Sequence, residues 1–130
     1  MPQTKIFGLA NTLNPIKKEL SEVIHSCFVQ ALQYPPEKRF HRFFPMGESD
    51  FFFPSDRSNQ YLIIEISMFE GRSVEAKKNL IDLLIKSIQK KFDISDNDIE
   101  ITIFETPKYN WGIRGVAGDE LKLSYKVDIS

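Results

Sequence analysis

The sequence lacks the features typical of disulfide-rich, membrane-spanning and nucleic-acid-binding proteins. It contains one cysteine, Cys27, among 130 residues, so an internal disulfide is excluded. No apolar run is long enough to span a membrane, and no charged segment followed by an apolar one opens the chain. The formal net charge is −1, which argues against a broad basic surface for nucleic acid or anionic lipid. We therefore expect a cytoplasmic protein that binds neither nucleic acid nor membranes.

Motifs for common cofactors and metals are also lacking. Nothing resembles a glycine-rich phosphate loop, a nucleophile elbow or a zinc signature. His25 and Cys27 lie two residues apart on an expected helix, so their side chains point to different faces and cannot share a metal ion. His41 receives no role. We expect no metal and no cofactor.

What the chain does have is a strand, helix, strand pattern in its first half. Residues 5–9 read as an apolar strand and residues 39–44 as a second one. Between them, Asn14-Pro15 predicts a helix opening, because a capping side chain precedes proline at the first helical position. Apolar residues then recur at helical spacing as one stripe: Ile16, Leu20, Val23, Ile24, Cys27, Phe28, Ala31 and Leu32.

The second half repeats this pattern. Residues 61–69 are an isoleucine-rich strand, Ser73 is placed to cap a helix, and residues 99–105 form another strand. The second helix has its own apolar stripe: Ala76, Leu80, Ile81, Leu84, Ile88 and Phe92. Matching landmarks recur after 56 to 59 residues, which indicates a tandem repeat with little sequence identity between its halves.

Two such units predict an α+β fold, with a four-stranded sheet and both helices on one face. We expect a single domain, with a first β-α-β unit at about 2–46, a second at about 60–105, and a C-terminal hairpin and tail at 106–130. Residues 45–59 are expected to be a loop or an edge segment. The other sheet face would lack cover, and the run Phe51-Phe52-Phe53 adds apolar surface, so we expect an oligomer.

Pro2 follows Met1 at the head of the first strand. Aminopeptidases remove Met before a small residue, which would leave a prolyl secondary amine at the chain end. An α-amino group has a pKa near ~8, and an apolar pocket lowers that pKa toward neutrality. Pro2 is thus a candidate general base.

Three segments of the second half together resemble the 4-oxalocrotonate tautomerase family. In that family an E-G-R-S turn leads into a helix, and a strand ending in glutamate leads to an aromatic-glycine hairpin. Three segments of this chain match these features in the same order and with similar spacing: Glu70-Gly71-Arg72-Ser73, Ile101-Thr102-Ile103-Phe104-Glu105 and Asn110-Trp111-Gly112-Ile113-Arg114-Gly115. With Pro2 heading the first half, the chain resembles fused, two-unit members such as malonate semialdehyde decarboxylase and the cis-3-chloroacrylic acid dehalogenases.

This resemblance implies a homotrimer and a cofactor-independent keto-enol tautomerase for small carboxylated enols or 2-keto acids. It implies that Pro2 is the general base and that Arg72 grips the substrate carboxylate. Arg39 matches a second substrate-binding arginine, which one-unit members contribute across a subunit boundary. Trp111 matches an aromatic residue of the pocket wall.

Departures from the related families favour tautomerisation over their other reactions. Phe69 stands where the dehalogenases carry the first of two arginines, and Lys38 stands where the decarboxylase carries an aspartate. Glu37 could replace that aspartate only if the turn shifts. In the second half, Glu100 occupies the position of the one-unit enzymes' second arginine. The alternative is a catalytically silent trimeric scaffold or carboxylate-binding module, because a retained Met1 would make the Pro2 nitrogen an amide.

Overall fold

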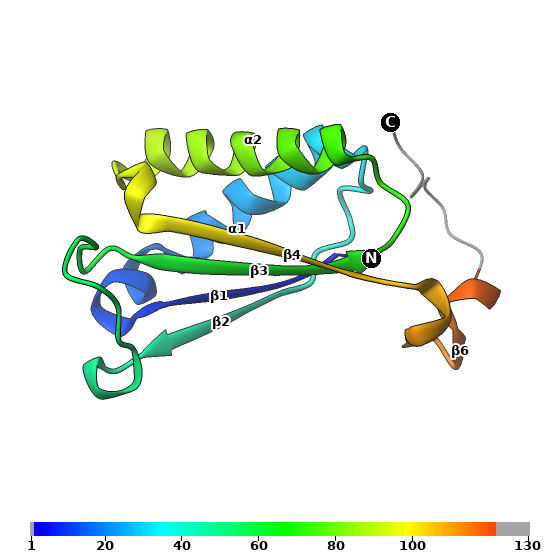
Figure 1. The fold of residues 1–130 in the computed structure, drawn as a ribbon, viewed down its shortest axis with the longest axis horizontal. Coiled ribbons are helices and arrows are strands. Elements are labelled where there is room, and N and C mark those ends of the chain that lie inside the picture. Colours follow the sequence, from blue (N-terminus) through cyan, green and yellow to red (C-terminus); the bar gives the residue numbers. More distant parts are fainter. Residues whose placement is uncertain (1, 122–130) are drawn as a thin grey trace.

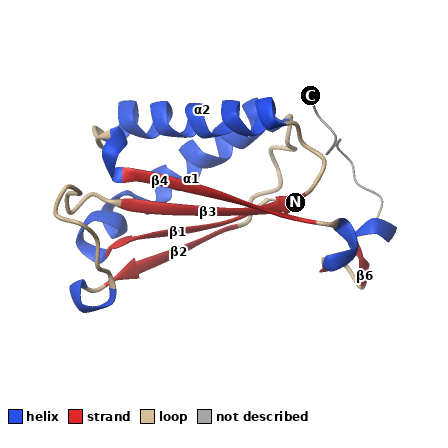
Figure 2. Cartoon of the chain, in the orientation of Figure 1, coloured by secondary structure: helices blue, strands red, loops and turns tan. Residues whose placement is uncertain are grey.

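The computed structural model describes residues 2–121, which form a four-stranded sheet with two helices on one face and a small hairpin beyond it (Figure 1). The layers of helix and sheet are separated by colour in Figure 2. In chain order the elements are β1 (Gln3–Leu9), α1 (Ala10–Leu32), β2 (His41–Met46), β3 (Leu62–Phe69), α2 (Val74–Phe92), β4 (Ile99–Thr106), β5 (Gly112–Ile113) and β6 (Val116–Ala117). Single turns of 3₁₀ helix lie at Glu48–Asp50, Asp96–Asp98, Lys108–Asn110 and Gly118–Glu120. Within the described part of the chain, neither long helix has the length and apolar character needed to cross a bilayer.

The sheet has the strand order β2-β1-β3-β4. Each outer pair is parallel, because a helix crosses back between its two strands, whereas the central pair is antiparallel. The two β-α-β units join along that central pair, where Gln3 lies opposite Ser67 and Gly8 opposite Leu62. The predicted fold class, two β-α-β units in one four-stranded sheet with both helices on one face, is confirmed.

The core lies between the sheet and the helix layer. Alternate residues of a strand point to the same face, and on β1 and β3 the residues Ile6, Ile64 and Ile66 are fully buried against the helices. Both predicted helical stripes face this core. Their most buried members are Leu20, Ile24, Cys27, Phe28 and Leu32 on α1 and Ala76, Leu80, Leu84 and Ile88 on α2.

The start of α2 agrees with the sequence prediction. Ser73 has an extended backbone, and its hydroxyl oxygen accepts a hydrogen bond from the Ala76 amide at 3.0 Å. That contact satisfies one of the amide donors left open at a helix start. At the other end, Asp93 adopts a left-handed φ of 54° and its amide donates to the Gln89 carbonyl. The predicted cap is confirmed.

The start of α1 differs from the prediction. The helix begins at Ala10, directly after β1, and the opening expected at Asn14-Pro15 is wrong. Leu9 is the residue before the helix and its side chain makes no capping hydrogen bond. Burial of Leu13 against the core holds the first turn in place instead. Pro15 therefore lies inside the helix, on its exposed side.

The aromatic run before β3 lies in a loop and not in an edge strand. Phe51 and Phe53 pack against Tyr61, with ring centroids 5.7 and 5.4 Å apart from it. Phe52 is 85% exposed. Two of the three rings therefore cover their own chain, and the surface that the run adds is mainly one phenylalanine.

The sheet face opposite the helices does carry apolar side chains. Phe7 and Phe44 stack there with ring centroids 4.8 Å apart, and they are partners in the ladder between β1 and β2. Phe104 on β4 is 48% exposed. Exposed aromatic surface of this kind is typical of an interface with another molecule.

We predict that Pro15→Ala stabilises the protein by about 1 kcal/mol or more, because proline inside a helix removes an amide donor and alanine is the best helix former. Denaturant unfolding followed by circular dichroism measures the change. Pro54→Ala is the matched control, since Pro54 lies in an exposed loop, where proline restricts the unfolded chain. The control should gain no stability. A Pro15→Ala variant no more stable than the parent would show that the proline costs this helix nothing.

Candidate active site

The four candidate site residues, Pro2, Arg39, Arg72 and Trp111, all lie at one end of the sheet. β1 and β2 begin at this end, because they are parallel, and β3 and β4 finish there, because β3 runs antiparallel to β1. Pro2 precedes β1, Arg39 precedes β2, Arg72 follows β3 and Trp111 follows β4. The start of β1 lies beside the end of β3 in Figure 1. The strand order places Pro2 and Arg72 at the centre of this end, with Arg39 and Trp111 at its two edges.

Pro2 is buried, although it lies outside any strand or helix. The next residue, Gln3, is already paired with Ser67 near the end of β3. The position of Pro2 is therefore fixed by the central ladder of the sheet, and its ring lies in surroundings with little solvent.

Arg72 is also buried, with 4% of its surface exposed. It lies in the tight connection from β3 to α2, where Gly71 has a φ of 131°, a value that side chains other than hydrogen rarely tolerate. The Glu70 amide donates to the Thr106 carbonyl at 3.0 Å and fixes the start of this turn against β4. The glycine of the Glu70-Gly71-Arg72-Ser73 motif is thus required to turn the chain just before Arg72.

Arg39 is exposed and differs in this respect from Arg72. The strand begins two residues later than predicted, at His41, so Arg39 lies in the segment that leads into β2. The Thr4 amide donates to the Phe40 carbonyl at 2.9 Å and ties this segment to β1. Arg39 lines a shallow pocket with Gln3, Phe40, His41 and Arg42, and the Arg42 guanidinium donates to the Gln3 side chain at 3.3 Å.

Trp111 packs edge-to-face against Phe69, with ring centroids 5.0 Å apart. Phe69 is fully buried at the end of β3. The Gly118 amide donates to the Trp111 carbonyl at 2.7 Å, which ties the residue before β5 to the residue after β6. Phe69, which replaces an arginine of the dehalogenases, therefore gives Trp111 its apolar support.

No role was predicted for either histidine, and in the structure both lie where α1 packs against the segment carrying Arg39. Nδ1 of His41 lies 2.8 Å from the Ser21 hydroxyl, and Nε2 of His25 lies 2.7 Å from the Pro36 carbonyl. Burial first, then the nearby positive charges of His25 and Arg39, lower the pKa of His41 to about 4. The spacing of Ser21 and His25, four residues apart and hence on one helix face, is the signal that could have revealed this cluster.

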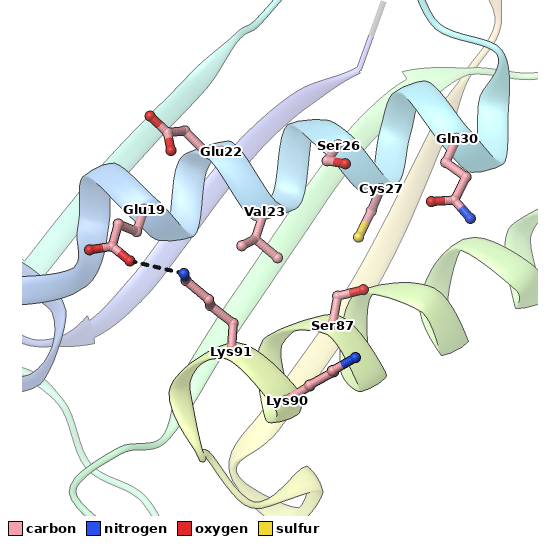
Figure 3. A pocket seen from close by; sticks show the side chains of 9 residues that line it. All are labelled: Glu19, Glu22, Val23, Ser26, Cys27, Gln30, Ser87, Lys90 and Lys91. Atoms are coloured by element: carbon pink, nitrogen blue, oxygen red, sulfur yellow. Dashed lines mark ion pairs between the residues drawn. The ribbon is translucent and has the colours of Figure 1, made fainter.

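A groove between α1 and α2 has a different character (Figure 3). Glu19 and Lys91 form an ion pair across it at 3.6 Å, and Cys27 points into the space between the helices. Burial raises the pKa of the Cys27 thiol, so the reactive thiolate is disfavoured. Across residues 2–121, no group of three or more His, Cys, Asp or Glu side chains is placed to hold a metal ion. The groove therefore lacks the buried proline and the buried arginine that lie at the end of the sheet.

Gly118 supplies a test of the packing around Trp111. An added Cβ there would lie 2.6 Å from the Lys108 carbonyl oxygen and 3.1 Å from the Phe69 ring. We predict that Gly118→Ala displaces the hairpin and changes the emission of Trp111, the single tryptophan of the chain. Gly112→Ala is the control, because its Cβ would meet nothing within 4 Å. Unchanged fluorescence in Gly118→Ala would contradict this packing.

The sequence is similar to known tautomerases. The family model described as "Tautomerase enzyme" matches residues 38–114, which include Arg39, Arg72 and Trp111. The 2-hydroxymuconate tautomerase of Comamonas testosteroni is 37% identical to this chain over 57 residues, covering 44% of this chain and 90% of that protein.

Two solved structures share the fold at low sequence identity. The FG41 malonate semialdehyde decarboxylase inhibited by 3-bromopropiolate has a TM-score of 0.76 at 20% identity, covering 85% of this chain and 87% of its own. The R7 fused 4-OT wild-type asymmetric trimer has a TM-score of 0.79 at 17% identity, covering 90% of this chain and 96% of its own. The family match spans more than half of the sequence and agrees with the resemblance carried by its motifs. The chain belongs to the tautomerase family.

Proposed function

We propose that this chain is a cofactor-independent keto-enol tautomerase that acts on small carboxylated enols or 2-keto acids. The observation that carries the proposal is the placement of Pro2, Arg39, Arg72 and Trp111 at one end of one sheet. Proton transfer on an acidic substrate needs a base and fixed positive charge, and these residues supply both. The units at about 2–46 and 60–105 and the hairpin that follows act as a single domain in this proposal, and the end of the expected tail, residues 122–130, lies outside the described residues.

Pro2 is the proposed general base. Once Met1 is removed, the neutral prolyl nitrogen takes the proton from the enol hydroxyl, and the oxygen keeps the electron pair as an enolate. Return of that proton to the substrate carbon forms the ketone and restores the neutral amine. Burial of Pro2 supports this role, because a site with little solvent disfavours the protonated amine.

Arg72 is the proposed anchor for the substrate carboxylate. Its planar guanidinium stays charged and can bind a carboxylate through two parallel hydrogen bonds. Because Arg72 is itself buried, charge interactions of its guanidinium are stronger than at the surface. Withdrawal of electron density toward this anchor stabilises the enolate that forms in the reaction.

Arg39 and Trp111 complete the proposed site. Arg39 supplies a second positive charge from the sheet edge, either to its own site or to that of a neighbouring subunit. Its exposure leaves it available for a substrate or partner. Trp111, supported by Phe69, forms an apolar wall that helps keep the Pro2 amine neutral.

We also place the chain in a homotrimer. The support is the apolar sheet face of Phe7, Phe44 and Phe104, together with the fold shared with a fused 4-OT that is described as a trimer. Light scattering at micromolar concentration checks this assembly, and a stable monomer would contradict it.

The second candidate is a trimeric scaffold that binds carboxylates without catalysis. It applies if Met1 is retained before Pro2, since an acylated proline nitrogen is not a base. An ultraviolet assay with phenylenolpyruvate and 2-hydroxymuconate, combined with intact mass, separates the two candidates. Processed and active protein supports the enzyme. Processed protein without activity on either enol contradicts it.

Arg72→Ala should lower kcat/KM for a carboxylated enol by about 30-fold or more, because a charged hydrogen-bonding partner of the transition state is lost. Arg72→Lys keeps the charge without the planar fork, so its loss should be intermediate. Arg57→Ala is the control, because Arg57 lies at the opposite end of the sheet, next to Asp56, and its kcat/KM should stay close to the parent value. A melting curve for each variant separates loss of activity from loss of folding. Parental kinetics in folded Arg72→Ala would rule out the anchor.

A further inference from the structure

Two side chains of α1 hold the segment that carries Arg39. Ser21 and His25 lie one helical turn apart, and both are buried. Each contacts the chain on a different side of Arg39, since His25 reaches Pro36 and Ser21 reaches His41. The two contacts therefore enclose a stretch of only six residues with Arg39 inside it.

The contact at Pro36 fixes a turn. A carbonyl oxygen only accepts hydrogen bonds, so Nε2 of His25, at 2.7 Å, carries the hydrogen and donates it. The Lys38 amide donates to the Pro35 carbonyl at 3.1 Å, which closes the turn that His25 holds. Tyr34 packs edge-on against the His25 ring at 6.3 Å and restricts its orientation.

The contact at His41 fixes the start of β2. Its ring lies edge-on between two residues of α1, with centroids 6.0 Å from Phe28 and 6.1 Å from His25. On the other side, the ladder pairs His41 with Thr4 of β1. Arg39 itself is exposed, so its backbone position is set by these neighbours and not by burial of its own side chain.

We infer that His25 is a positioning residue that, with Ser21 and His41, holds Arg39 where it supplies the second positive charge to the anionic substrate. The inference rests on the proposed function, because it assigns a purpose to the fixed position of Arg39. With this role, residues of α1 support a site that is otherwise built from loops at the end of the sheet.

The charge state of His41 is consistent with this role. The titratable or charged groups facing it are His25 from α1 and Arg39 from the loop, while Thr4 and Ser21 do not titrate in this pH range. Burial and these charges lower the pKa of His41, so the ring is neutral at pH 7 and adds no repulsion beside Arg39. Since the folded state resists protonation, this contribution to stability is present above the ordinary histidine pKa and falls as the pH drops from about 6.5 toward 4.

The test compares His25→Leu, which removes the donor, with His25→Gln, whose amide can still donate to Pro36. His25→Leu should raise KM for phenylenolpyruvate by about tenfold with kcat little changed, because a misplaced second arginine weakens binding of the anionic substrate. His25→Gln should recover most of the loss. Arg39→Ala should raise KM similarly, and adding His25→Leu to it should have no further effect, since both act through one contact.

Hydrogen exchange of the Lys38 amide gives a readout that does not depend on activity. It should speed up in His25→Leu and return toward the parent rate in His25→Gln. Cys27→Ala is the matched control, because it alters a buried residue of the same helix without touching the turn, and should leave both KM and this exchange rate unchanged.

The outcomes separate this inference from the proposed function. If Arg39→Ala raises KM while His25→Leu does not, or if His25→Leu is equally harmful without Arg39, the positioning role is wrong and the tautomerase proposal stands. If the parent enzyme is inactive on every enol, the function fails. In that case, unchanged Lys38 exchange in His25→Leu would also overturn the positioning of the turn.

Discussion

The antiparallel pairing of β1 with β3 is the interaction on which the rest of the structure depends. It joins the two β-α-β units and sets Gln3 opposite Ser67 and Ile6 opposite Ile64. Because side chains alternate between the faces of a sheet, a shift of one residue would turn Ile6 away from the helices and unpack the core. The same register brings Pro2 beside the end of β3, from which the turn containing Arg72 departs. Folding and the candidate site therefore depend on one ladder.

The two ends of the sheet carry different side chains, although the two β-α-β units have the same arrangement of elements. At the end opposite Pro2, the buried carboxylate of Asp98 accepts hydrogen bonds from the amide and hydroxyl of Ser58, at 2.8 and 2.6 Å. Glu100 accepts from the Tyr61 hydroxyl at 2.9 Å. These contacts hold the loop before β3 in place. They also occupy the carboxylates of Asp98 and Glu100, which could otherwise face a ligand. The proposed chemistry is accordingly confined to the end with the chain start.

Much of this arrangement could be predicted from the sequence, because it depends on local periodicity. Both apolar stripes and the Ser73 cap could be predicted, since each follows from residues within a few positions of one another. The start of α1 could not, because burial of Leu13 in the core overrides the local preference of Asn14-Pro15. The contacts of His25 with Pro36 and of Ser21 with His41 also join residues far apart in the chain, and only the packed fold shows them.

The claim at the centre of this account is that the Pro2 nitrogen is a free amine and the base of the reaction. Nuclear magnetic resonance of protein labelled with [¹⁵N]proline observes that nitrogen directly during a pH titration. If Pro2 is the base, its signal titrates below the ordinary α-amino value of ~8, at the pH where kcat/KM for an enol substrate rises. An active enzyme whose prolines all show amide signals that do not titrate would contradict it.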